Sequence, residues 1–245
     1  MIHYTKGIVL KTIKYGETSV IASVFTELFG IQSYIQNGIR NSGKTSSKAA
    51  MFQPAAILEL NVYHIELKSL QRIKEYKWHY LYRHVLTDVI KNTVAMYMVE
   101  LLQKCLKQPE TNRDLFLFAE DALLHLDNAD MTITANFPLY FGLHLADFFG
   151  FKIRNNYSAT NNIINLEQGM FTDTYPSHTF FLEGPASEAI SLILKVQHPL
   201  ELDQVKLNKN IRRDILQALQ TYYTLHIQDF GNMKTLPVVQ AIFAD

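Results

Sequence analysis

Hydrophobic and polar residues alternate with a period of two along the first third of the chain. Between Gly30 and Gly38, odd-numbered positions fall on one side of an extended chain and even-numbered positions on the other, as in a half-buried β-strand. The run from 19 to 24 alternates in the same way. Gly16 and Gly30 stand where the chain must reverse, and glycine accepts the positive φ of tight turns. The pattern predicts three consecutive antiparallel strands.

Two further strands follow at 57–62 and 69–77. In the first of them Leu58, Leu60 and Val62 alternate with polar residues, and Pro54 suits the start of an edge strand. Five short strands followed only by helical patterns match an OB-fold barrel better than a sandwich, which usually has about seven strands. The chain is therefore predicted to be an α+β protein with an N-terminal five-stranded OB-fold barrel and an all-helical second domain.

A helical period replaces the alternation from Asp88 onward. Helices are predicted at 88–106, 112–126, 136–149, 185–196 and 209–230. The third would begin near Asn136 with Pro138 in its first turn. The segment 151–184 lacks the period and is rich in Asn, Ser and Thr, with a small hairpin at 163–172. The predicted domains are 1–80 and 81–245, with 151–184 an irregular insertion.

The net charge of zero hides a division between the two predicted domains. Residues 1–80 carry ten Lys and Arg against five Asp and Glu, whereas 81–245 carry thirteen against eighteen. A basic module can face phosphates. Arg72, Lys74 and Tyr76 share one parity in the fifth strand, so two cations and a stacking ring are expected to project from one face. The predicted nucleic-acid-binding residues, which the resemblance given below makes DNA-binding residues, are Lys11, Lys14, Arg40, Lys44, Lys48, Arg72, Lys74 and Tyr76.

Each of these assignments has a plainer alternative. The segment RNSGKTSSK, which holds Arg40, Lys44 and Lys48, is also typical of a solvated loop. Tyr76 could instead cover the end of the barrel. The sequence alone does not decide between these alternatives.

The string from Gly38 to Thr45, GIRNSGKT, satisfies the P-loop pattern G-x-x-x-x-G-K-[ST] and suggests a nucleotidase as the alternative function. A P-loop cradles phosphates because it opens directly into a helix. Only eight residues separate Thr45 from Pro54, and the surrounding pattern is a β-meander rather than alternating strands and helices. The context argues against this activity.

Other catalytic and targeting signals are missing from the sequence. There is no G-x-S-x-G and no His pair at helical ligand spacing, so an enzyme is not expected and no cofactor is implied. The single cysteine, Cys105, excludes a multi-cysteine zinc site and is expected to be buried. With neither a membrane-spanning run nor a signal-peptide pattern, the expected location is the cytoplasm.

The stretch TKGIVLKTIKYGETSVIASVFTELFGIQSYIQNGIR resembles the opening of the bacterial DNA repair protein RecO family, and FQPAAILEL continues the likeness. The resemblance implies a nucleoid-associated recombination mediator that binds single- and double-stranded DNA and anneals strands. It also implies contacts with the tail of single-strand-binding protein and with RecR, and help in loading RecA. Gly38-Ile39-Arg40 would occupy the family's G-x-R turn. Many members carry a four-cysteine zinc motif within 151–184, and this chain has no cysteine there.

Two hypotheses therefore compete with DNA annealing: a P-loop nucleotidase, and a structural adaptor whose barrel binds only protein. Nucleotide-dependent stabilisation would reveal the nucleotidase. The acidic helical domain, poorly suited to phosphates, is expected to carry the main protein-partner site.

Overall fold

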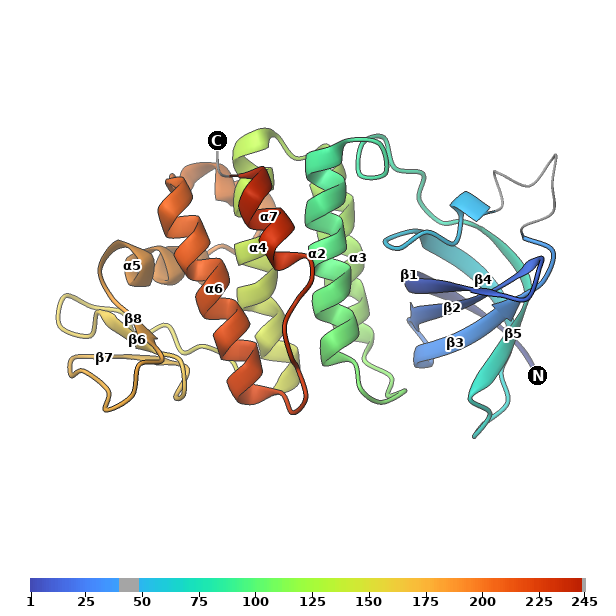
Figure 1. The fold of residues 1–245 in the computed structure, drawn as a ribbon, viewed down its shortest axis with the longest axis horizontal. Helices are drawn as coiled ribbons and strands as arrows, with labels where there is room; N and C mark the ends of the chain where they lie inside the picture. Colours follow the sequence, from blue (N-terminus) through green and yellow to red (C-terminus); the bar gives the residue numbers. More distant parts are fainter. Residues whose placement is uncertain (40–48, 244–245) are drawn as a thin grey trace. The chain divides into compact units, whose positions relative to one another are not determined.

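The computed structural model describes residues 1–39 and 49–243. Figure 1 shows its strands and helices. The chain divides into two compact units, one made of Met1–Arg83 with Leu106–Leu124 and the other of His84–Cys105 with His125–Asp245. We call them the barrel unit and the helical unit. The division into domains at 1–80 and 81–245 stays a prediction.

The barrel unit is built on five strands that close on themselves in the order β1-β2-β3-β5-β4. They are β1 (Ile2–Tyr15), β2 (Ser19–Thr26), β3 (Gly30–Gln36), β4 (Ile57–Tyr63) and β5 (Leu70–Trp78). Neighbouring pairs are antiparallel except β3 and β5, which run parallel over three residues and complete the barrel. The predicted OB-fold barrel and its three consecutive antiparallel strands are confirmed.

The barrel interior is filled by the alternate residues that the period-two pattern indicated. Val20, Ala22 and Val24 of β2 face Tyr34 of β3, and all four are buried. Burial raises the pKa of the Tyr34 phenol well above its usual value, because the charged form would lose its hydration. The residues of opposite parity in β2 and β3 point away from the barrel interior and are half-buried, except Phe25, which is fully buried.

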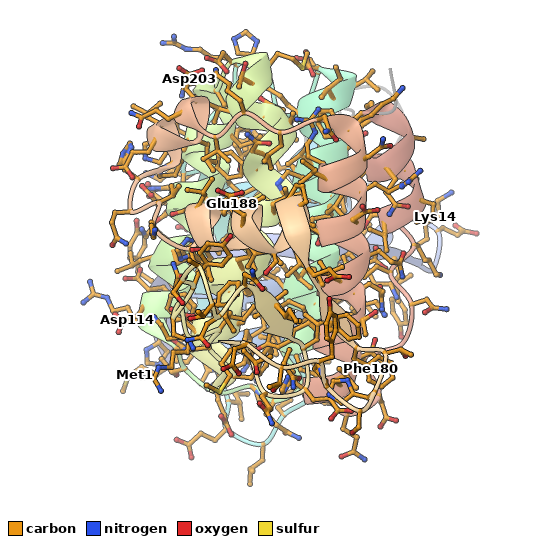
Figure 2. All side chains as sticks on the ribbon, turned by 90° about the vertical axis from the view of Figure 1, so that its left-hand side faces the viewer. Met1, Lys14, Asp114, Phe180, Glu188 and Asp203 are labelled. Carbon is orange, nitrogen blue, oxygen red and sulfur yellow. The ribbon has the colours of Figure 1, made fainter. Side chains whose placement is uncertain are left out.

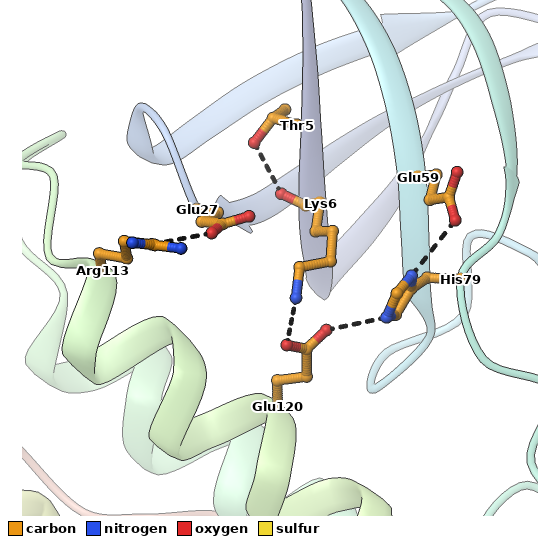
Figure 3. Close-up of polar contacts among 7 residues, drawn as sticks. All are labelled: Thr5, Lys6, Glu27, Glu59, His79, Arg113 and Glu120. Atoms are coloured by element: carbon orange, nitrogen blue, oxygen red, sulfur yellow. Dashed lines mark hydrogen bonds and ion pairs between the residues drawn. The ribbon is translucent and has the colours of Figure 1, made fainter.

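Helix α3 (Arg113–Asn128) begins in the barrel unit, where ion pairs join its first turns to the barrel (Figure 3). Lys6 of β1 donates to Glu120, and His79 places Nε2 3.2 Å from the other carboxylate oxygen of Glu120. The Arg113 Nε lies 3.1 Å from Glu27. Glu120 is only 6% exposed, and a buried carboxylate is tolerated only when it is paired in this way.

The same network continues across the barrel wall to Glu59 of β4 (Figure 3). Lys77 lies 2.8 Å from Glu59, and the His79 Nδ1 lies 3.3 Å from it. Hydrogen bonds from Lys77, then Tyr4, then His79 lower the pKa of the Glu59 carboxyl to about 2. Glu59 is therefore ionised at neutral pH and holds Lys77 at the barrel surface.

The helical unit surrounds one apolar helix, α4 (Met131–Leu145), which contacts α2, α5 and α6. The other elements are α2 (Val89–Cys105), η1 (Ala146–Phe149), β6 (Ile163–Asn165), β7 (Met170–Thr172), β8 (Phe181–Leu182), α5 (Gly184–Ile193), η2 (Pro199–Gln204), α6 (Lys209–His226) and α7 (Leu236–Ile242). Among the described residues, no helix combines the length and apolarity that crossing a membrane requires.

The predicted start of α4 was wrong. The helix begins five residues earlier, capped by Asp130, whose carboxylate accepts from the Ile133 N–H at 2.9 Å. Pro138 therefore sits inside the helix, where it removes a hydrogen bond and costs about 3 kcal/mol or more. Twelve of the fifteen residues of α4 are buried, and this packing offsets the cost.

Several smaller expectations are confirmed. The hairpin predicted at 163–172 is the pair β6 and β7. Cys105 is buried and forms no disulfide. One boundary was wrong, because the last long helix ends at His226 rather than at 230. The His226 Nε2 lies 3.0 Å from the Leu166 carbonyl oxygen.

Replacing Gly30 by alanine tests how closely the segment before α3 approaches the barrel. Gly30 has φ +60°, and an added Cβ would meet the backbone of Glu110, its carbonyl carbon at 2.7 Å. Gly16 is the matched control, because its φ is +59° and its Cβ would meet nothing. Both variants pay about 1–2 kcal/mol for a left-handed residue. Thermal unfolding should show Gly30→Ala losing clearly more stability than Gly16→Ala, and equal losses would contradict the close approach.

Candidate nucleic-acid interface

The outer surface of the barrel strands carries two rows of side chains that the strand register aligns. Residues directly opposite each other in neighbouring strands point to the same face. The first row consists of Lys11, Ser23, Ser33 and Leu70. The second consists of Ile13, Ile21, Ile35, Arg72 and Tyr63. We call them the outer rows, and they cross the β2–β3 face with which OB-folds bind oligonucleotides.

The outer rows combine cations at their margins with aliphatic and hydroxyl groups in the middle. Lys11, Ile13, Arg72 and Tyr63 are exposed, whereas Ile21 and the other central members are half-buried. Within the described residues, neither the Lys11 ammonium nor the Arg72 guanidinium forms an ion pair. Cations without a protein partner can neutralise phosphates.

The loop between β4 and β5, residues 64–69, borders this face and is held in one shape by Gln71. The Gln71 Nε2 donates to the carbonyl oxygens of Ile65 and Lys68, both at 2.8 Å, and its Oε1 accepts from the Ile65 N–H at 3.1 Å. At the base of the loop, the His64 ring stacks on Phe29 with centroids 4.0 Å apart. The loop is therefore pre-organised, although it is exposed.

A hollow of about 670 Å³ lies between this loop, the β2–β3 face and the segment that leads into α3. Its apolar walls come from Phe29, Ile31, Ile65, Leu67, Leu106 and Pro109, and its polar lining includes Ser33, Ser69 and Thr111. Lys68 and Lys107 add two cations, and Glu66 adds one acid. All of these residues belong to the barrel unit.

The structure brings together only part of the predicted site. Lys11 and Arg72 lie in the outer rows. Lys14 pairs with Val20, so its parity is that of the barrel interior, and its exposed side chain extends from the end of β1 (Figure 2). The Lys74 ammonium lies 3.9 Å from Glu75, a weak and exposed pair. The DNA-binding role of all four stays a prediction.

The expectation that Arg72, Lys74 and Tyr76 project from one face is wrong. The register with β4 shifts at Lys74, because Val62 pairs with Ile73 whereas Asn61 pairs with Glu75. An extra residue in one strand reverses its parity from that point on. The ring of Tyr76 therefore packs on the barrel core, 4.9 Å from Phe52, and burial raises its pKa. Tyr76 covers the barrel end and is poorly placed as a stacking platform.

Arg40, Lys44 and Lys48 lie outside the described residues, as does most of the string from Gly38 to Thr45. Their assignment stays a prediction. Sequence reasoning missed Lys68 and Lys107, which line the hollow. Lys68 could have been found from its position in the chain, since the loop between strands 4 and 5 of an OB-fold borders its ligand face. Nothing in the local pattern marks Lys107, which depends on the tertiary fold.

Comparisons with known proteins agree over the whole chain. Residues 1–82 match the family model "Recombination protein O N terminal", and residues 86–236 match "Recombination protein O C terminal". The chain belongs to the RecO family. A protein of Christiangramia forsetii described as DNA repair protein RecO is 32% identical over 243 residues, which cover 99% of this chain and 100% of the relative.

Two further RecO relatives have the same description. The one from Flavobacterium psychrophilum is 32% identical over 245 residues, covering 98% of each chain. The one from Azobacteroides pseudotrichonymphae is 28% identical over 243 residues, covering 99% of this chain and 100% of the relative. The likeness spans both units.

In this RecO chain, asparagine side chains hold the segment where the resemblance placed a zinc motif. The Asn156 amide donates to the Phe171 carbonyl oxygen at 2.8 Å and accepts from the Phe171 N–H at 2.9 Å. Asn155 pairs in the same two-way fashion with Ser191 of α5. The small sheet β7-β6-β8 that results carries Phe180 at its margin (Figure 2). Among the described residues, no three His, Cys, Asp or Glu side chains are grouped as metal ligands would be.

Replacing Asn156 by alanine tests whether these amides stabilise the segment in place of a bound metal ion. The change leaves both backbone groups of the buried Phe171 without their partner, which costs about 1–3 kcal/mol. Asn162→Ala is the control, because Asn162 is exposed and its amide makes only one long bond, 3.4 Å to Ala159. Thermal unfolding should show the loss of stability for Asn156→Ala alone.

Chelation should leave the melting curve of the wild-type protein unchanged. Stoichiometric zinc found by elemental analysis, and lost together with folding on chelation, would contradict this account.

Proposed function

We propose that this RecO-family chain is a DNA repair protein that binds single- and double-stranded DNA and anneals complementary strands. In this proposal it also helps to load a recombinase onto strands coated by single-strand-binding protein. The family match over both units supports the repair role. The pair of outer rows is the observation that carries DNA binding, because it places Lys11 and Arg72 on the OB-fold ligand face.

The composition of the outer rows suits annealing. Two strands repel each other through their phosphates, and cations that neutralise this charge let them approach. The middle of the rows is Ile21, Ile35, Ser23 and Ser33, none of which is an aromatic ring that would hold a base by stacking. A strand bound by its backbone keeps its base-pairing edges free, which annealing requires.

The protein acts by binding rather than by catalysis in this proposal. The alternative, a nucleotidase using Gly38 to Thr45, is not favoured because that string joins β3 to β4 in a closed barrel whose strand pairs are antiparallel, except for the short pair of β3 and β5. A P-loop needs a parallel strand and an adjoining helix. ATP should therefore leave DNA binding unchanged.

The protein partners proposed are the tail of single-strand-binding protein, RecR and, indirectly, RecA. We place the main partner site on the helical unit. A hollow of about 280 Å³ there has apolar walls that include Leu192, Val196 and Val205, and Lys195 and Glu201 line it. The apolar walls suit the apolar residues of a peptide, and Lys195 can pair with an acidic residue of that peptide.

Replacing Lys11, Lys68 and Arg72 together by alanine tests the interface. Each phosphate contact on a single strand contributes about 0.7 to the slope of log affinity against log salt. Binding titrations at several salt concentrations should therefore show weaker binding to all sequences and a slope shallower by about two. Strand annealing should slow with it.

The matched control is Lys195, Lys209 and Arg213 replaced together by alanine, which removes the same charge from the helical unit. That variant should keep the wild-type slope. A third variant, with Arg40, Lys44 and Lys48 replaced, tests the predicted segment outside the described residues. If the first and third variants both keep wild-type affinity and slope, DNA does not bind through this face.

A further inference from the structure

Leu67 occupies the tip of the β4–β5 loop in an unusual conformation. Its side chain is fully exposed, and its φ is +63°, a left-handed value that branched and bulky residues rarely adopt. The loop around it is fixed by the three Gln71 hydrogen bonds and by a backbone bond from the Lys68 N–H to the Ile65 carbonyl oxygen at 3.3 Å. A rigid support thus presents an apolar side chain to solvent.

Folding alone does not account for a leucine at this position. The side chain is fully exposed where it borders the hollow, so it contributes no buried apolar area. Glycine or asparagine would adopt the same backbone conformation with less strain. Strained, exposed residues on rigid supports are typical of functional sites.

The surroundings of Leu67 match those of an apolar wedge between bases. Proteins that unstack nucleic acids insert Leu, Ile, Met or Phe between adjacent bases while cations hold the phosphates on either side. Here Lys68 follows directly in the chain, and Arg72 lies in the neighbouring outer row. The hollow of about 670 Å³ beside Leu67 falls within the range of about 300–1,000 Å³ that accommodates small organic ligands.

We propose that Leu67 inserts between two bases of a bound strand where it leaves a duplex, and that the displaced base enters the hollow. This inference rests on the proposed DNA-binding function and deepens it. Glu66 lines the hollow together with Lys68 and Lys107, and its negative charge offsets part of theirs, so the hollow favours a phosphate less than a purely cationic one would. The apolar walls and the serine and threonine hydroxyls suit the faces and edges of a base.

The test uses the full chain and a partial duplex with 2-aminopurine in the first unpaired position of the single strand. Fluorescence of this base rises when it loses its stacking partners. The wild type should raise the signal on saturation, and Leu67→Gly should lose at least four-fifths of that rise. Glycine accepts φ +63°, so this variant should melt no lower than the wild type. Leu81→Ala is the control, since Leu81 is another exposed leucine of the barrel unit.

The outcomes separate this inference from the proposed function. If Leu67→Gly binds within about threefold of wild-type affinity but lacks the fluorescence rise, the wedge is supported. If it binds with the full rise, the wedge is overturned while DNA binding stands, and Leu67 would then be free to contact a protein instead. If the wild type itself does not bind the partial duplex, both the proposed function and this inference fail.

Discussion

The short parallel pairing of β3 with β5 is the interaction on which the proposed interface depends. It covers only three residues of each strand, yet it closes the barrel and removes both open edges of the sheet. It also sets Arg72 opposite Ile35 and brings the β4–β5 loop beside the β2–β3 face. Without this closure the outer rows would not be continuous, and the hollow would lack one wall.

The barrel and most helices could be predicted because they follow a simple period. The period failed where one residue interrupts it. The bulge at Lys74 reverses the parity of β5 from that residue on. No residue in KEYK, residues 74–77, is of a type that indicates a bulge, so the alternation predicts the wrong face for Tyr76. Pro138 caused the wrong helix start for a different reason. Proline favours the first turn of a helix, but the burial of nearly all of α4 stabilises a helix that has Pro138 in its interior.

The candidate site was only partly predictable for a related reason. Charge selects Lys11 as a candidate, and charge together with strand parity selects Arg72; both are local properties. Lys68, Lys107 and the hollow between them depend on three segments that are distant in sequence. The asparagines of 155–165 stand out in the sequence only as composition. Their structural role depends on the fold, because the amides of Asn155 and Asn156 bond to backbone and side-chain groups of distant residues.

The central claim is that DNA binds across β2, β3 and the β4–β5 loop. Amide hydrogen exchange of the full chain, with and without a single-stranded oligonucleotide at saturating concentration and low salt, tests it most directly. The account predicts added protection in residues 19–36 and 64–72, with little change in 184–226. Protection confined to the helical unit, with the barrel strands and the loop unchanged, would contradict it.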